Sequence, residues 1–215
     1  MKLVVAPCDH NASKHAVMNW HYSKAMPSGK LIKFGVWEND TFVGSIIYGR
    51  GATPELGSPY GLDQVEVCEL VRVALTRHTT PVSQIIAITI EKVKQTNPGL
   101  RLVVSFADSA QGHHGGIYQA GNWLYLGQSI HHRIRIKGEL IHPRSLGAKY
   151  GRGGQSIPWL KTNVDRNAER VTVPGKHRYV FPLDKQMRRQ LAKLAMPYPA
   201  NEGLTVSHTS SSSEV

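Results

Sequence analysis

The stretch from Leu100 to Gly127 constrains the fold of this chain more strongly than any other. An apolar strand, Leu102–Ala107, runs into the carboxylate of Asp108. A Gly- and His-rich turn, a short helical segment and a second apolar strand, Trp123–Leu126, follow. Because open α/β sheets bind ligands outside the carboxyl ends of their strands, Asp108 is a candidate functional residue. The same position suits a carboxylate that only caps the following turn, and both roles stay open.

The part of the chain before this stretch alternates between helix and strand. We expect a helix over Asn11–Trp20 and a β-hairpin from Lys30–Trp37 and Thr41–Tyr48, which are rich in β-branched and aromatic residues. The Gly- and Pro-rich residues 49–61 predict a long loop. Asp63–Leu75 is the next strand, and its interrupted alternation predicts a bulge near Glu69.

A second helix is expected after Thr80, which suits an N-cap, and Pro81, which suits the first helical position. Apolar residues then recur at helical spacing as far as residue 93. Unpaired N–H groups at such a helix start attract phosphate or carboxylate. We therefore expect the anionic part of a cofactor to lie near Arg77, His78, Thr79 and Thr80. The sequence contains neither a Walker motif nor a dinucleotide-binding glycine pattern.

Length and composition indicate one domain with an extension, because 215 residues can bury a substantial core. The two cysteines, Cys8 and Cys68, lack the spacing of zinc ligands, which argues against a disulfide framework and favours a reducing cytosol. No apolar run reaches the roughly 18 residues of a membrane span, so no membrane partner is expected. The apolar stretch at the start of the chain is too short for a signal peptide.

The net charge of +11 is concentrated in one segment. Residues 1–130 contain 11 Lys and Arg against 9 Asp and Glu, whereas residues 131–195 contain 15 against 4. A basic block of this kind usually meets a polyanion, and the alternative is a solvated basic surface. We therefore expect nucleic acid as the partner.

Within this basic segment, Ile130–Ile136 alternates apolar and basic residues and predicts a strand with a cationic face. Leu140–Gly154 is expected to be a basic loop, followed by a last strand at Val180–Leu183 and a short helix at Asp184–Leu194. Aromatic residues among cations can stack bases while the charges follow phosphates, although they can equally be packing. The candidate DNA-binding residues are Arg133, Arg135, Lys149, Arg152, Lys161 and Arg178.

The order of hairpin, strand, helix and strand resembles the GNAT acyltransferase fold, an α/β fold with a mixed central sheet flanked by helices. Within that superfamily the chain is most similar to the bacteriophage Mom family of DNA-modification proteins. The likeness is carried by HYS at 21–23, ELVRV at 69–73, SFAD at 105–108, GIYQAGNWLYLG at 116–127 and HPRSLGAKYG at 142–151. It implies a catalytic core over residues 1–135 and a basic extension over 136–198 packed on it. Residues 199–215 are expected to be a disordered tail.

The resemblance implies an enzyme of the host cell cytoplasm that adds a carbamoylmethyl group to the exocyclic amine of adenine in double-stranded DNA, which protects phage DNA from restriction. The adenine must then be flipped out of the duplex. The matching functional residues are His21, Tyr22, Arg72, Asp108 and Tyr118. The resemblance also implies a bound iron ion, for which His21 and Asp108 form an N/O ligand pair.

One departure from the acyltransferase pattern concerns the donor. The glycine-bearing pyrophosphate loop is replaced by TRHTTP at 76–81, which argues against acyl-CoA and leaves the donor open. Arg72 can alternatively form a structural ion pair with Glu66 or Asp108, and His21 and Tyr22 can simply end a helix. Two other functions remain alternatives: an acetyltransferase for a protein or small molecule, and a non-catalytic nucleic-acid-binding protein.

Overall fold

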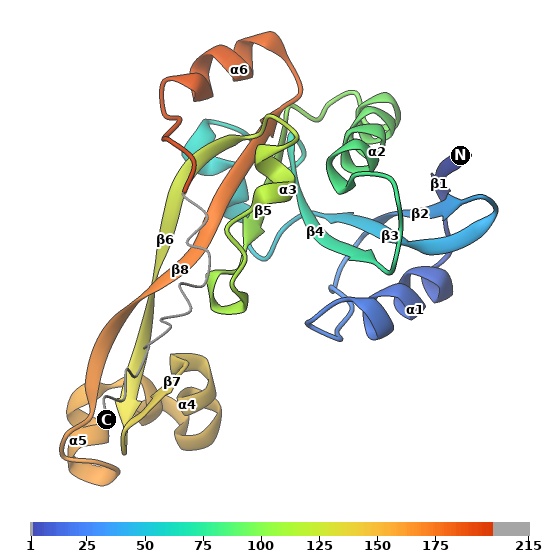
Figure 1. The fold of residues 1–215 in the computed structure, drawn as a ribbon. Coiled ribbons are helices and arrows are strands. Elements are labelled where there is room, and N and C mark those ends of the chain that lie inside the picture. The colour runs from blue at the N-terminus through green and yellow to red at the C-terminus, as the bar shows by residue number, and fades with distance from the viewer. Residues whose placement is uncertain (1, 200–215) are drawn as a thin grey trace, which may run out of the picture.

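The computed structural model describes residues 2–199, which form one eight-stranded sheet with the strand order β1-β2-β3-β4-β5-β8-β6-β7 (Figure 1). Only β4 and β5 run parallel among these neighbours; the other pairs are antiparallel. The strands are β1 Leu3–Pro7, β2 Ile32–Glu38, β3 Thr41–Gly49, β4 Val67–Leu75, β5 Leu102–Ala107, β6 Leu124–Ile136, β7 Glu139–Ile141 and β8 Glu169–Pro182. This is the predicted mixed sheet flanked by helices, and that prediction is confirmed.

Helices cover both faces of the sheet. The α-helices are α1 His10–Trp20, α2 Val82–Thr96, α3 Gly116–Gln119, α4 Pro143–Tyr150, α5 Ile157–Asn163 and α6 Lys185–Ala192. Helix α1 packs on β3 and β4 through Ala16 and Val17, and α6 packs on β5 and β8 through Met187 and Leu191. We call this side the α1 face. The opposite face carries the main core, where α2 and the Tyr118 side chain of α3 pack on the sheet. No helix within residues 2–199 is long and apolar enough to cross a membrane.

The parallel pair β4–β5 is short, and this shortness creates the site described below. The two strands are paired at only three positions, from Val67↔Leu102 to Glu69↔Val104. Beyond these positions β4 continues along β3, while β5 continues along β8. The carboxyl ends of β4 and β5 therefore diverge. The predicted hairpin and the helix after Pro81 are also confirmed, as β2–β3 and α2. The expected cap was wrong, because α2 begins at Val82 with Pro81 as its N-cap and without a side-chain cap from Thr80.

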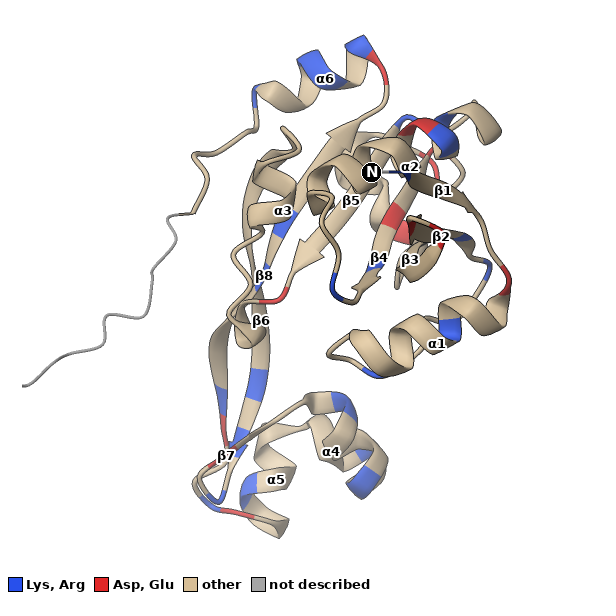
Figure 2. Cartoon of the chain, turned by 45° about the vertical axis from the view of Figure 1, so that its right-hand side comes forward, with Lys and Arg blue, Asp and Glu red and all other residues tan. Residues whose placement is uncertain are grey.

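The second half of the chain leaves the core as a long ribbon. Strands β6 and β8 pair from Leu124↔Val180 out to Arg135↔Glu169, and they extend away from the core to a small unit built from β7, α4 and α5 (Figures 1 and 2). We call residues 131–173 the distal lobe. Its own apolar core consists of Ile134, Ile136, Leu146, Leu160 and Ala168.

Several expectations for this half were wrong. Leu140–Gly154 is not a loop but contains β7 and α4, because Pro143 and the His142 cap start a helix whose Leu146 packs on β6. The two strands expected around residues 123–136 are one strand, β6, with register shifts between Tyr125 and Ile130. The last strand begins at Glu169, much earlier than expected.

The division into a catalytic core over residues 1–135 and a basic extension over 136–198 stays a prediction. The expected boundary at residue 135 falls inside β6, and β8 lies between β5 and β6 in the central sheet. The basic segment is therefore both part of the sheet and the whole of the distal lobe. The expected tail lies, apart from Pro199, outside the described residues.

Candidate active site

A pocket of about 710 Å³ lies where β4 and β5 diverge. The end of α1 and the following turn form one wall, β4 and the start of α2 form a second, and the 112–118 loop forms a third. Lys176 of β8 also lines it, so one cation of the basic segment reaches the pocket. Its polar or ionisable lining side chains are Trp20, His21, Tyr22, Glu69, Arg72, His78, His113, His114, Tyr118 and Lys176.

A bulge in β4 places Glu69 and Arg72 on the same side of the sheet. Tyr48 pairs with Leu70 and Ile47 pairs with Arg72, so Val71 is an extra residue. In a regular strand, residues 69 and 72 would point to opposite faces. The extra residue returns Arg72 to the α1 face, where Glu69 already points. The bulge expected near Glu69 is therefore present two residues later.

Glu69 is the pocket carboxylate that the sequence analysis missed as a candidate. Burial raises the pKa of its carboxyl group, while the charges of Lys176 and Arg72 oppose that rise. A carboxyl group with a raised pKa in a pocket is typical of a general acid or base. The signal was present in the ELVRV motif, but without the bulge Glu69 and Arg72 could not be assigned to one side.

Arg72 ties the turn after α1 to β4. Its Nε and Nη2 atoms donate to the Ala25 carbonyl at 3.3 and 3.2 Å, and Nη1 donates to the Val71 carbonyl at 2.7 Å. These bonds replace the ion pair with Glu66 or Asp108 that the sequence had left open. Because a guanidinium has five N–H donors, two remain for a ligand in the pocket. Arg72 thus positions the turn that carries His21 and Tyr22 and still faces the pocket.

His21 ends α1, and its imidazole is held in one tautomer. The backbone N–H of Ser23 donates to Nδ1 at 3.1 Å, and the Ser23 hydroxyl lies 2.8 Å from the same atom. An Nδ1 that accepts a hydrogen bond leaves the proton of the neutral ring on Nε2. Burial, followed by the charges of Arg72, His113, Lys176 and Lys24, lowers the pKa of His21 to about 4. His21 is therefore a neutral hydrogen-bond donor rather than a base.

Tyr22 and Tyr118 differ strongly in their exposure. Tyr22 is 47% exposed; its ring centroid lies 4.3 Å from that of His21 and 5.5 Å from that of His113. Tyr118 is 6% exposed, and its hydroxyl lies 2.8 Å from the Ser105 hydroxyl. Burial raises the pKa of Tyr118 to about 12, so its phenol stays protonated at neutral pH. Tyr22 is accessible to a large ligand, whereas Tyr118 closes the floor of the pocket.

Asp108 lies beside the pocket rather than among its lining residues. One carboxylate oxygen accepts from the Ala110 backbone N–H at 3.1 Å and caps a 3-10 turn, Ser109–Gln111. The other oxygen lies 3.6 Å from the Lys176 Nζ atom. Asp108 thus has the capping geometry that the sequence allowed, and it also neighbours a pocket cation.

The expected anion site at the start of α2 is occupied by a side chain of the protein. The Glu38 carboxylate accepts from the backbone N–H groups of Thr79 and Thr80 at 2.8 and 2.7 Å. Arg77 is exposed and does not line the pocket. His78 does line it, and its Nδ1 lies 2.7 Å from the Thr76 carbonyl, which leaves Nε2 as an acceptor.

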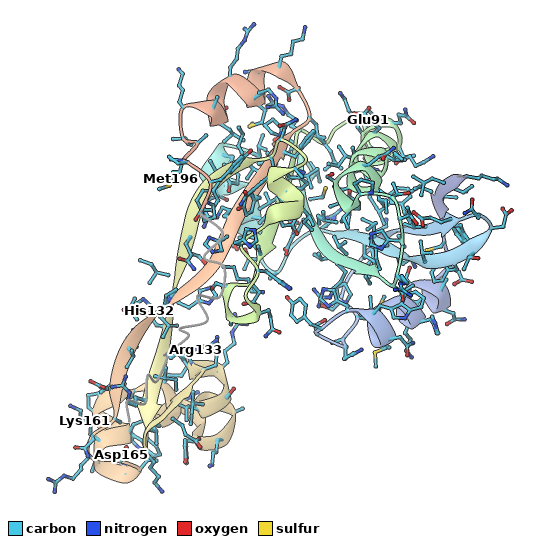
Figure 3. All side chains as sticks on the ribbon, viewed as in Figure 1. Glu91, His132, Arg133, Lys161, Asp165 and Met196 are labelled. Carbon is cyan, nitrogen blue, oxygen red and sulfur yellow. The ribbon has the colours of Figure 1, made fainter. Side chains whose placement is uncertain are left out.

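The candidate DNA-binding residues lie on the ribbon, the distal lobe and the sheet, away from the pocket lining. Figure 3 shows Arg133 on the β6–β8 ribbon, at the end of the distal lobe nearer the core, and Lys161 at the far end of the lobe. Arg135 forms an ion pair with Glu169 on the neighbouring strand. Arg178 interacts with Tyr60 on the α1 face of the central sheet. Arg133 and Arg135 share one face of β6, whose other face, with Ile134 and Ile136, packs into the lobe core.

The expected iron pair fits this arrangement poorly. Nδ1 of His21 is occupied as an acceptor and Nε2 carries the proton, so the neutral ring has no lone pair to offer. The Asp108 carboxylate is engaged by Lys176 and by the Ala110 amide. Among residues 2–199, no group of three or more His, Cys, Asp or Glu side chains could hold a metal ion. The side chains present here do not form an iron site.

The fold of this chain is similar to the folds of several solved structures. FeeM, an N-acyl amino acid synthase from uncultured soil microbes, has a TM-score of 0.48 and 12% identity, covering 89% of this chain and 96% of its own. A Bacillus subtilis acetyltransferase, solved with CoA, has a TM-score of 0.47 and 12% identity, covering 85% and 99%. A probable GNAT acetyltransferase from Chromobacterium violaceum has a TM-score of 0.45 and 10% identity, covering 85% and 83%.

Comparison of the sequence with known proteins identifies a family, which the structural similarity does not. The chain is 29% identical over 186 residues to methylcarbamoylase mom of Escherichia phage Mu, which covers 83% of this chain and 76% of the phage protein. The Mom protein family matches residues 2–200, which include the pocket, the ribbon and the distal lobe. The chain therefore belongs to the Mom protein family.

Proposed function

We propose that this chain is a DNA-modification transferase that adds a carbamoylmethyl group to the exocyclic amine of adenine in the host cytoplasm and so protects phage DNA from restriction. The observation that carries the proposal is the pocket between β4 and β5, which places the Glu69 carboxyl among cationic and imidazole side chains. Membership of the Mom family and the basic distal lobe support the same reaction on DNA.

The chemistry requires a base. The lone pair of the adenine amine is delocalised into the ring, so the amine is a weak nucleophile. In the proposed reaction the amine nitrogen forms a bond to the methylene carbon of the donor. The bond from that carbon to its leaving group breaks, and the leaving group takes the electron pair. Ionised Glu69 accepts the proton that the amine loses, and its raised pKa makes it a stronger base than an ordinary glutamate.

The cationic side of the pocket suits the donor. Arg72 keeps two N–H groups free for the leaving group or for the carbonyl oxygen of the transferred amide. Lys176 lies on the same side of the sheet and is held there by Asp108. The Nε2–H of His21 supplies a further neutral donor. In this assignment Asp108 is a positioning residue that acts through Lys176.

The DNA substrate must deliver its base into the pocket. An adenine paired in a duplex cannot reach the pocket, so it must be flipped out at a cost of a few kcal/mol. Tyr22 is exposed at the pocket and offers an aromatic surface on which a flipped base can stack. The distal lobe, with nine Lys and Arg against three Asp and Glu, suits the phosphate backbone beside the flipped base.

Mass spectrometry of nucleosides from DNA isolated after expression of the chain tests the proposal. We expect a carbamoylmethylated deoxyadenosine with the wild-type chain and none with Glu69→Gln. Unmodified DNA together with acetyl-CoA-dependent acetylation of a protein or small molecule would replace the proposal with an acetyltransferase. Tight DNA binding without an altered nucleoside would replace it with a non-catalytic binding protein.

A further inference from the structure

The start of α2 contains a group of hydrogen-bond donors that the protein fills with its own carboxylate. The Glu38 Oε2 atom accepts from the Thr79 N–H at 2.8 Å, and Oε1 accepts from the Thr80 N–H at 2.7 Å. Glu38 is only 8% exposed. The hydroxyl of Thr80, a residue 2% exposed, is a third donor at the same place, and together with the two amides it holds the pKa of the Glu38 carboxyl group below its usual value.

These donors form the kind of site that binds a phosphate group. Consecutive backbone N–H groups before a helix converge on one point, and the dipole of the 15-residue helix α2 adds a positive potential there. The site is also close to the pocket, because His78 and Val82 line the pocket on either side of it in sequence. A phosphate-bearing ligand in the pocket could therefore reach these amides if Glu38 were absent.

The Glu38 carboxylate is held in place by its strand. It is the last residue of β2, opposite Thr41, and a two-residue turn of Asn39 and Asp40 with positive φ follows it. The turn is fastened to the N-terminal strand region, since the Asn39 N–H donates to the Lys2 carbonyl at 2.8 Å and the Lys2 N–H donates to the Asn39 side chain at 3.0 Å. A ligand would have to displace a buried and doubly hydrogen-bonded anion to gain these donors.

We propose that Glu38 is a built-in anion that blocks phosphate binding at the start of α2 and selects for a donor without a phosphate group at this position. For the identity of the donor the inference rests on the proposed function, whereas the exclusion of phosphate can be measured without any reaction. The donor is then held inside the pocket by Arg72 and Lys176. An acyl carrier that depends on a pyrophosphate contact at this helix start is excluded.

The test compares Glu38→Ala with the wild-type chain and with Glu91→Ala, which removes an exposed glutamate from α2 itself (Figure 3). Inorganic pyrophosphate and CoA are the probes, with thermal unfolding and calorimetry as readouts. Because the basic distal lobe can itself attract these anions, the comparison is made at high salt, where we expect neither probe to bind the wild-type chain or Glu91→Ala at millimolar concentration. For Glu38→Ala, pyrophosphate at about ten times its dissociation constant should raise the unfolding midpoint by about 4 °C.

Two results would overturn the inference. One is wild-type binding of CoA that pyrophosphate displaces, which would show that Glu38 does not exclude the phosphate. The other is a folded Glu38→Ala chain, checked by circular dichroism, that gains no affinity for pyrophosphate. If Glu38→Ala does not fold, Glu38→Gln is used instead: it removes the charge and one of the two acceptors, so we expect a smaller gain in pyrophosphate affinity, and no gain would overturn the inference. If the wild-type chain does not modify DNA and neither overturning result is seen, the outcome counts against the proposed function and leaves the exclusion of phosphate by Glu38 intact.

Discussion

The core and the distal lobe differ in net charge and in the amount of apolar packing. The core segment before the lobe, residues 1–130, is almost neutral, and the sheet buries large apolar clusters on both faces. The lobe carries nine Lys and Arg against three Asp and Glu around only five buried apolar side chains. Figure 2 shows these cations along the ribbon and on α4 and α5, while the pocket lies in the core.

The two regions therefore meet different requirements: the core must place reacting groups exactly, and the lobe must attract a polyanion. A pocket that must hold a base and a donor in one geometry needs a rigid, well-packed frame. A surface that follows a phosphate backbone needs positive charge more than exact placement. Lys176 is where the two regions meet, because it belongs to the basic segment, lines the pocket and pairs with Asp108.

The largest expected effect lies in the core. Glu69→Gln should lower DNA modification by at least about 100-fold, because it removes the proton acceptor while keeping the size of the side chain. DNA affinity should stay within about twofold of wild type, since the lobe is unchanged. Nucleoside mass spectrometry and fluorescence anisotropy measure the two quantities. Glu55→Gln, at an exposed glutamate outside the pocket, is the control. Equal loss of modification and of affinity would break the separation of the two regions.

The opposite effect is expected in the lobe. Arg152→Glu combined with Lys161→Glu should weaken binding to all DNA sequences by about tenfold and reduce the slope of log affinity against log salt by about 2. Salt titrations by anisotropy measure both. Lys92→Glu with Lys94→Glu on α2, in the core, keeps the same charge change and should leave the slope unaltered. A salt-independent wild-type affinity would refute the assigned role of the lobe.

A smaller effect tests the hydrogen-bond role of His21. His21→Gln keeps an N–H donor near the position of Nε2 and should lower modification by only about threefold. His21→Glu replaces that donor with an acceptor and should lower it by about tenfold or more. Single-turnover modification assays compare the two variants. Greater activity of His21→Glu than of His21→Gln would show that His21 accepts rather than donates.

The smallest effect is on stability. The folded chain holds the pKa of His21 at about 4, below the 6.5 of an unperturbed histidine, so the unfolded chain binds more protons between these values. Stability should therefore fall as the pH drops from 6.5 towards 4 and should be unaffected by this group above 6.5. His21→Gln should remove about 1 kcal/mol of that loss, as measured by urea unfolding at pH 5 and pH 7. An unchanged pH dependence would show that His21 is protonated in the folded chain.

Much of the core could be predicted from the sequence because its signals are local. The β2–β3 hairpin follows from two β-branched runs with a short link, and α2 follows from its apolar spacing. The lobe was harder, since α4 and α5 have seven or eight residues each and few apolar side chains, and they are stabilised by contacts with β6. Propensity alone is weak for such short helices.

The candidate site was predicted only in part, for a similar reason. His21, Tyr22, Arg72 and Tyr118 line one pocket, and the functional role that the resemblance implied for them stays a prediction. Glu69 was missed because its side of the sheet depends on the position of the bulge, and Lys176 was missed because β8 comes from far along the chain. The backbone N–H groups of Thr79 and Thr80 donate to Glu38, which lies 41 and 42 residues earlier in the chain. No local sequence pattern predicts such a long-range contact.

The bulge at Val71 also has a consequence for how this family can change over time. Val71 matters because it is an extra residue in β4, whatever its side chain. The number of residues between Glu69 and Arg72 keeps these two side chains on one face of the strand. Substitutions at residue 71 can be absorbed by local packing against α1. A single-codon deletion or insertion between residues 69 and 72 would instead turn Arg72 towards α2 and disconnect the turn that bears His21. In descendants of this chain, side chains in β4 can vary more freely than its length.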